Sequence, residues 1–223
     1  MNPRSRLSTT AIAGLTAVLL LAGCGGGDGD GGAKAADKAS SAPTTTGASA
    51  SASPSASASA SSDGRPKITL PSDVTLTFEG GRTGDAVKDA VLADSAEMTR
   101  AVDAAIAGTD PKGEGMGYYT TGKALEASLS WVGQFKKANV TITGVVRYYN
   151  RKVTLKSNTA AIVTYCGDES KGFSKDKKTN KINKTPVTKD SYVTYNTRLD
   201  KNSDGVWQTS QIISARGAAQ CQP

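Results

Sequence analysis

The chain has 223 residues and no histidine, and its 27 basic and 20 acidic residues give a formal net charge of +7. Without imidazole, the sequence excludes Ser/His/Asp and Cys/His catalysis, and it excludes histidine metal ligands. An enzyme built from this chain would have to use carboxylates, tyrosine, lysine or arginine.

The amino end has the pattern of an export signal. Arg4 and Arg6 precede an apolar run over residues 11–22, and small residues then lead to Cys24. This pattern is typical of a secretory signal peptide, and the apolar run is too short to span a membrane well. The sequence therefore predicts a signal peptide over residues 1–23.

The four residues that end at Cys24, "LAGC", resemble the lipobox of bacterial lipoproteins. This resemblance implies cleavage before Cys24, attachment of diacylglycerol to its thiol, and a place on the extracytoplasmic face of the cell membrane. Membrane lipid would then be a partner through Cys24. The alternative is an ordinary secretion signal that happens to end in cysteine.

Residues 24–66 consist mainly of Gly, Ala, Ser, Thr and Pro, as in "GGGDGDGG" and "ASASASPSASASASS". Such a segment has no large apolar side chains to bury, so we predict a disordered tether. Residues 67–223 are long enough for one globular domain with its own core.

Two cysteines remain once Cys24 is set aside, namely Cys166 and Cys221. Two cysteines outside the cytoplasm most simply form a disulfide, and the alternative is two free thiols.

The first part of the domain predicts an edge strand and two helices. The strand, "KITLPSDVTLTF" (67–78), alternates apolar and polar residues and is interrupted by Pro71. A helix over about 83–111 has acidic residues near its amino end and Gly108 near its carboxyl end. Its apolar residues at helical spacing are Val87, Val91, Met98, Val102 and Ile106.

A Gly-rich loop then precedes a second helix over about 120–139. On this helix we expect Leu125, Leu129 and Val132 to share one face, with Trp131 and Phe135 beside it.

From Val140 onward the apolar period changes to two. Five alternating, β-branched segments are separated by Asn, Gly, Asp or Pro: "VTITGVVRYYN", "KVTLKSN", "AAIVTYC", "SYVTYNTRL" and "VWQTSQIISA". Helices followed by strands predict an α+β fold in which the helices pack on one face of a mostly antiparallel sheet.

Two motifs extend this prediction, "AAIVTYCGDES" and "TRLDKNSDGVWQTSQ", the latter followed by a terminal cysteine. Together with the preceding helices, they resemble the NTF2-like (cystatin-like cone) domains of exported Gram-positive lipoproteins. The resemblance implies a curved sheet, joined cysteines and a cavity between helices and sheet, in a group that largely lacks a known activity. This sequence departs from the pattern of that family at Gln208-Thr209, where the family usually has a more apolar strand.

The stretch from Asp200 to Gly205 has oxygen-bearing residues at the first positions of an EF-hand calcium loop. The position of the bidentate glutamate holds Gln211, however, and a strand pattern follows where a helix should begin. Because Asp-Gly between two alternating runs is a strong hairpin signal, we predict a turn and no metal site.

A lysine-rich segment spans residues 171–189. It could bind anionic lipid head groups or an anionic wall polymer; the alternative is a solvated hairpin extension whose charge maintains solubility. Nucleic acid is not favoured as a partner of this segment, because the expected location is outside the cell and the segment lacks aromatic residues spaced to stack on bases. The lysines are Lys171, Lys175, Lys177, Lys178, Lys181, Lys184 and Lys189.

The implied cavity raises the question of catalysis. Some relatives carry out isomerase or cyclase chemistry there, and the residues expected near it are Tyr119, Tyr148, Tyr165, Tyr192 and Asp168. Asp168 and Tyr165 are the candidate base and donor. The alternative is that Asp168 caps a turn and the tyrosines pack the sheet.

The sequence thus favours a non-catalytic ligand-binding or interaction module at the cell envelope. A small apolar ligand, a wall polymer or an envelope protein would be its partner, without a cofactor. The alternative is a small-substrate isomerase or hydratase.

Overall fold

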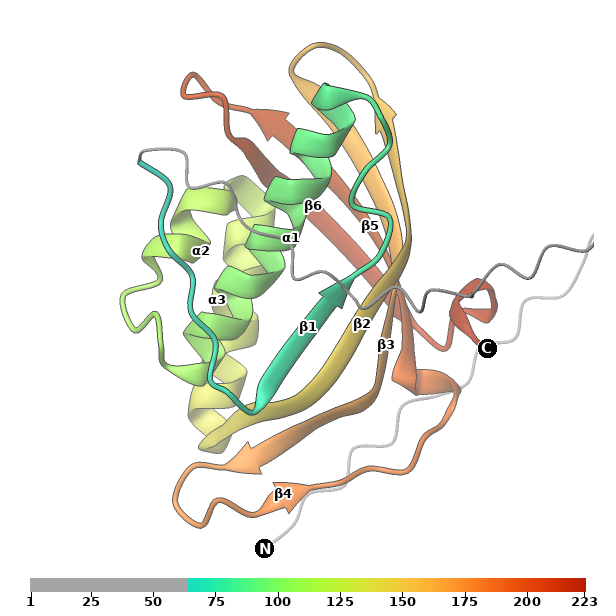
Figure 1. Cartoon of the computed structure of the whole chain (residues 1–223). Helices are drawn as coiled ribbons and strands as arrows, with labels where there is room; N and C mark the ends of the chain where they lie inside the picture. The colour runs from blue at the N-terminus through green and yellow to red at the C-terminus, as the bar shows by residue number, and fades with distance from the viewer. Residues whose placement is uncertain (1–63) are drawn as a thin grey trace, which may run out of the picture. The chain divides into compact units, whose positions relative to one another are not determined.

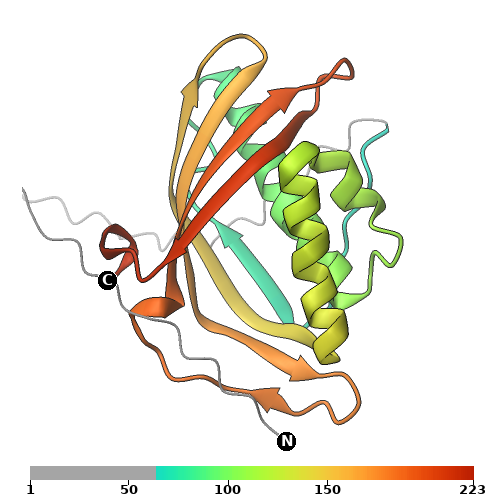
Figure 2. The same cartoon turned by 180° about the vertical axis from the view of Figure 1, so that it is seen from behind.

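A curved six-stranded sheet carries three helices on its concave face (Figures 1 and 2). The structure is a computed structural model that describes residues 64–223. The predicted signal peptide, Cys24 and nearly all of the predicted tether lie outside the described residues. The helices are α1 (Ala86–Ala107), α2 (Glu114–Tyr119) and α3 (Gly122–Ala138). The strands are β1 (Val74–Phe78), β2 (Val140–Leu155), β3 (Ala160–Asp176), β4 (Ile182–Asn183), β5 (Tyr192–Lys201) and β6 (Trp207–Arg216). Two short 3-10 helices are η1 (Lys189–Ser191) and η2 (Ala219–Cys221).

The strand order is β1-β2-β3-β5-β6, with β4 paired to the end of β3. β1 runs parallel to β2, and every other pairing is antiparallel. This confirms the predicted α+β class, and it is the cone arrangement that the resemblance to NTF2-like domains implies. No helix in residues 64–223 is both long and apolar enough to cross a membrane.

Two strand predictions need correction. The segments over 140–150 and 152–158 form one strand, because β2 continues through a register irregularity between Tyr149 and Lys152. Asn150 absorbs the extra residue with φ +52°, a conformation that asparagine tolerates. β3 also continues past the predicted end at Cys166, so the first part of the lysine-rich segment is strand.

Gly144 allows β2 to bend. Its φ is +98°, and a Cβ at this position would lie 2.1 Å from the carbonyl oxygen of Lys171 on β3. Only a glycine fits this close approach of two backbones, and glycines and bulges are the usual means of curving a sheet.

α1 begins and ends as predicted. The Asp85 carboxylate accepts hydrogen bonds from the amides of Val87 and Lys88, and Gly108 ends the helix with φ +87°. Of the predicted apolar face, Val91, Met98 and Ile106 are buried. Val87 lies in the first turn, before the helix reaches the sheet, and it is exposed.

α3 forms where it was predicted, and two members of its predicted face pack as expected, since Val132 is buried and Leu125 is partly buried against the same cluster. Ala124 and Ser128 complete the buried side in place of Leu129. Leu129 is 54% exposed. Ala124, Ser128 and Val132 are four residues apart and share one side of the helix, so Leu129, next to Ser128 in sequence, lies off that buried side. The preceding loop was expected to lack structure, yet it contains α2, which buries Met116 and Tyr119.

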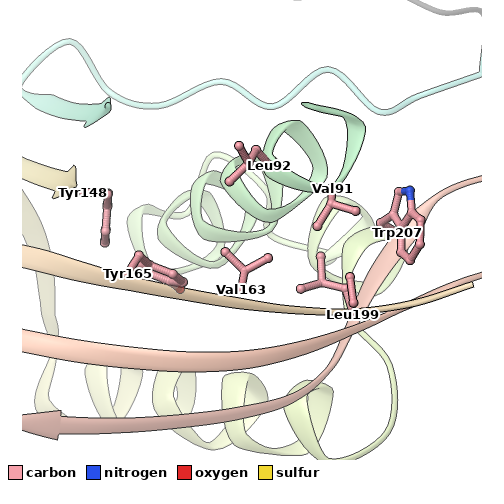
Figure 3. Packing of buried hydrophobic residues seen from close by; sticks show 8 residues of the cluster. Val91, Leu92, Tyr148, Val163, Tyr165, Leu199 and Trp207 are labelled. Carbon is pink, nitrogen blue, oxygen red and sulfur yellow. The ribbon is translucent and has the colours of Figure 1, made fainter. Parts of the chain in front are cut away.

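The main core joins α1 to the sheet (Figure 3). Val91 and Leu92 of α1 pack over Val163 of β3, Leu199 of β5 and Trp207 of β6. All five are at most 1% exposed, so their burial stabilises the packing of α1 on the sheet.

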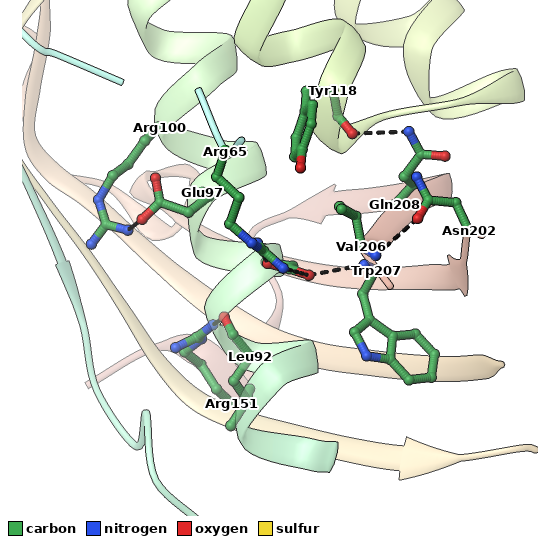
Figure 4. Close-up of polar contacts among 11 residues, drawn as sticks. Arg65, Leu92, Glu97, Arg100, Tyr118, Arg151, Asn202, Val206, Trp207 and Gln208 are labelled. Carbon is green, nitrogen blue, oxygen red and sulfur yellow. Dashed lines mark hydrogen bonds and ion pairs between the residues drawn. The ribbon is translucent and has the colours of Figure 1, made fainter. Parts of the chain in front are cut away.

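A partly buried ion pair holds the start of the domain against α1 (Figure 4). The Asp94 carboxylate of α1 is 2% exposed, and it pairs with the Arg65 guanidinium and accepts a 2.8 Å hydrogen bond from the Trp207 amide. Three distant parts of the chain therefore meet at the Asp94 carboxylate. Their contacts compensate its negative charge, which would destabilise the fold if it were buried without a partner.

The predicted disulfide between Cys166 and Cys221 is present, with 5.4 Å between the two Cα atoms. It attaches the carboxyl-terminal η2 to β3 on the side of the sheet away from the helices (Figures 1 and 2). The Tyr149 hydroxyl donates to the Cys221 carbonyl and reinforces this attachment.

Candidate functional site

A cavity of about 540 Å³ lies between α1, α3 and the concave face of the sheet. Where it is lined by the helices, several residues are small, such as Thr99 on α1 and Ala127 and Ser128 on α3, so the space is not filled. Most of the wall is apolar. The large apolar residues that line it are Val74, Leu76, Met98, Val102, Ile106, Trp131, Phe135, Ile142, Val146, Phe173, Val193 and Ile212.

Three tyrosines from neighbouring strands form one part of the wall, namely Tyr148 on β2, Tyr165 on β3 and Tyr195 on β5. The rings of Tyr165 and Tyr195 stack with centroids 4.8 Å apart, and Tyr148 meets both edge-on. Burial raises the pKa of Tyr165 to about 12 and raises that of Tyr148 and Tyr195 well above 10. All three therefore keep their hydroxyl protons at neutral pH.

An ion pair lies beside the tyrosines. Glu169 of β3 accepts a 3.1 Å hydrogen bond from the Tyr195 hydroxyl and pairs with Arg216 of β6, with 2.7 Å between Oε2 and Nη1. Burial lowers the pKa of Arg216, but the Glu169 charge outweighs it, so the net shift is upward and the guanidinium stays charged. The charge of Glu169 is thus compensated within the protein.

Asp103 differs from Glu169 because it lacks such compensation. It projects from α1 into the cavity wall, and within residues 64–223 no hydrogen bond or ion pair holds its carboxylate. Burial raises the pKa of Asp103 to about 7, and the negative charge of Glu169 adds to the rise. The cavity therefore contains one carboxyl group that can gain or lose a proton near neutral pH.

The structure brings together part of the predicted site. Tyr148 and Tyr165 line the cavity, whereas Tyr119, Tyr192 and Asp168 do not. Asp168 lies 3.6 Å from Arg147 and accepts a hydrogen bond from the Ser170 amide. Burial acts to raise the pKa of Asp168, but Ser170 and Arg147 together lower it, so this carboxylate stays ionised.

Sequence reasoning missed Asp103, Glu169, Tyr195 and Arg216. Asp103 directly follows Val102 of the predicted apolar face, and an acid next to such a face is the one signal that could have identified it. The Glu169–Arg216 pair joins β3 to β6 across β5, so no local pattern could have shown it.

The lysine-rich segment lies mostly on the surface. Lys175 is partly buried and pairs with Asp73, and the Lys177 ammonium approaches the Ile106 carbonyl. The other five predicted lysines are exposed.

The stretch from Asp200 to Gly205 forms the turn of the β5–β6 hairpin, as predicted. The Asn202 side chain accepts hydrogen bonds from the amides of Asp204 and Val206, and Gly205 has φ +82°. Asp200 pairs with Arg198 in the sheet. The polar departure after Trp207 also has a structural role, because the Gln208 side chain donates to the Tyr118 carbonyl and joins β6 to α2 (Figure 4).

The chain matches no protein-family model, and no curated protein matches it in sequence. Solved structures do show similarity. A ketosteroid isomerase-like protein from Erwinia carotovora atroseptica is 15% identical, with a TM-score of 0.39 over 60% of this chain and 98% of that one. A ketosteroid isomerase candidate from Shewanella frigidimarina is 12% identical, with a TM-score of 0.33 over 58% and 98%. A protein from Catenulispora acidiphila is 10% identical, with a TM-score of 0.39 over 58% and 93%.

Proposed function

We propose that this protein is a binding module that takes a small, largely apolar molecule into its cone. The observation that carries the proposal is the cavity of about 540 Å³ with its apolar wall. Small-molecule sites in proteins are usually concave, mostly apolar and of this size, with a few polar groups that fix orientation.

We further propose that the module works outside the cytoplasm, anchored to the membrane through a lipid on Cys24. The "LAGC" motif supports this location, and so does the disulfide, since such bonds persist in oxidising compartments. Labelling cells with an alkyne fatty acid should modify the protein and leave a Cys24→Ser variant unlabelled. Equal labelling of both would reject the anchor. Contact of the exposed lysines with an anionic wall polymer stays a prediction.

Calorimetry with octan-1-ol tests the binding proposal. We expect saturable one-site binding, which the substitution Val102→Trp abolishes because an indole at this position occupies the cavity. Leu129→Trp adds the same side chain at an exposed position of α3 and serves as the matched control. Absence of saturable binding, or equal loss in both variants, would reject the cavity as the site.

A second candidate function is proton transfer, and the unpaired Asp103 carboxyl favours it. With a pKa of about 7, Asp103 could take a proton from the carbon beside a ketone, while the neutral Tyr148 hydroxyl donates a hydrogen bond to the enolate oxygen. Asp103 would then return that proton to the γ carbon. Asp168 is not suited to this role because it lies outside the cavity.

The substrate analogue cyclohex-3-enone tests this candidate, because its conjugated product absorbs in the ultraviolet. We expect conversion that Asp103→Asn removes and Asp204→Asn, in the exposed turn, retains. Equal rates with and without the protein would exclude this activity toward small enones.

A further inference from the structure

The charges that line the cavity are not balanced. Asp103 and Glu169 are acidic and Arg216 is basic, so the wall carries one net negative charge when both acids are ionised. The Glu169–Arg216 pair is complete in itself, with Tyr195 as an additional donor. The surplus charge therefore belongs to Asp103, in a wall whose other residues are mostly apolar or aromatic, with a few neutral hydroxyl side chains.

An ionised carboxylate in such surroundings needs a partner. Within the described residues Asp103 has no hydrogen-bond or ion-pair partner, and even its partial burial beside an apolar wall disfavours the bare charge. A ligand with a carboxylate or phosphate would increase the cost, because its charge would repel Asp103 while Arg216 is already paired with Glu169. A neutral ligand would leave Asp103 to be protonated. An ammonium group would compensate the charge and form charge-assisted hydrogen bonds.

The aromatic wall favours the same class of ligand. Tyr148, Tyr165 and Tyr195 line the cavity beside the acids, and tyrosine rings attract cations that lie over their faces. Asp103 and Tyr148 line the same cavity, and the negative charge of Asp103 adds to the rise in the pKa of Tyr148.

We propose that the ligand of this cavity is an amphipathic amine, whose apolar body fills the cone and whose ammonium group pairs with Asp103. This inference rests on the proposed binding function and specifies its ligand class. It assigns to Asp103 the role of selecting charge and to the apolar wall the role of providing affinity.

Amine binding should depend on pH in a characteristic way. The titratable and charged groups that line the cavity with Asp103 are Tyr148 on β2, Tyr165 and Glu169 on β3, Tyr195 on β5 and Arg216 on β6. The tyrosines stay neutral and Arg216 stays charged at physiological pH, so Asp103 dominates the titration near neutrality. The amine binds the ionised form of Asp103, so its affinity should rise with pH up to about 7 and then level off.

The experiment compares octylamine with octan-1-ol, which has the same chain length and no charge. At about pH 8.5 we expect the amine to bind roughly tenfold more tightly than the alcohol, as one charge-assisted hydrogen bond provides. Between about pH 5.5 and 8.5 we expect amine affinity to rise roughly ten- to thirtyfold, and alcohol affinity to stay constant or fall. Calorimetry in buffers of different ionisation enthalpy should show proton release on amine binding at the lower pH.

Two variants identify the responsible carboxylate. Asp103→Asn should remove the preference for the amine and its pH dependence while octan-1-ol still binds, and retained alcohol binding also shows that the variant is folded. Glu126→Gln removes a charge from the exposed side of α3 and should leave the preference unchanged.

The outcomes separate the two proposals. Equal affinity for amine and alcohol, or a preference that persists in Asp103→Asn, overturns the amine assignment and leaves the binding function in place. If neither compound binds, the binding function itself is overturned and the assignment with it.

Discussion

The substitution Asp103→Asn makes the sharpest prediction about stability. A carboxyl whose pKa is raised from 3.8 to about 7 holds its proton more tightly in the folded protein than in the unfolded chain. The free energy of unfolding must therefore fall as pH rises between these two values, and it must be constant above the higher one with respect to this group. Asparagine has nearly the same shape but does not ionise, so it should remove this loss.

The magnitude follows from the pKa difference. The rise from 3.8 to about 7 corresponds to roughly 4 kcal/mol, at about 1.4 kcal/mol per pKa unit. Asp103 is only partly buried and water can enter the cavity beside it, which reduces the penalty on the ionised form. We therefore expect Asp103→Asn to stabilise the protein by about 2–4 kcal/mol above pH 7, and by little near pH 4.

Urea unfolding of the wild type and the variant, at several pH values between about 4 and 8.5, measures this difference. Subtracting the two curves cancels the other titrating groups, and Asp204→Asn provides a control in the exposed turn. A stability difference that is the same at both ends of the pH range would refute the raised pKa of Asp103.

Three further substitutions test the fold, each by chemical denaturation. Cys221→Ser should lower the free energy of unfolding by about 4 kcal/mol, because it releases the long loop that the disulfide with Cys166 closes. The stability of this variant should not change with reductant, and a stability equal to that of the wild type would contradict the prediction. Gly144→Ala should lower the free energy of unfolding by roughly 3 kcal/mol or more, because a Cβ at this position meets backbone atoms of β3. The control Gly133→Ala lies on an exposed part of α3 with open space and should raise the free energy of unfolding by up to about 1 kcal/mol. Equal effects of the two substitutions would exclude the close approach at Gly144. Asp94→Ala should cost about 3–5 kcal/mol, because it leaves a guanidinium and a buried amide without their acceptor, and a loss below about 1 kcal/mol would show that the pair is dispensable.

Local signals in the sequence predict the framework well. Asp85 and Gly108 mark the two ends of α1, and the alternating segments after Val140 fall on β2, β3, β5 and β6. These features depend on neighbours in the chain, namely capping residues, turn residues and apolar period. The disulfide was also predictable, since only two cysteines remain after Cys24.

The site was harder to predict because its properties depend on residues distant in sequence. The pKa of Asp103 is raised only because the fold places it in the cavity wall near the charge of Glu169 on β3. Glu169 in turn is a paired acid only because Arg216 comes from β6. The exposure of Leu129 likewise depends on how closely α3 packs against its neighbours, which helical period alone does not determine.

The central claim, that the cone holds a small apolar ligand, is tested most directly by methyl NMR with octan-1-ol. We predict saturable shifts of methyl groups that line the cavity, Val102, Ile106 and Ile212 among them, with little change at Leu129 and Ile213 on the surface. Shifts confined to the exposed methyl groups, or none at saturating alcohol, would contradict the claim.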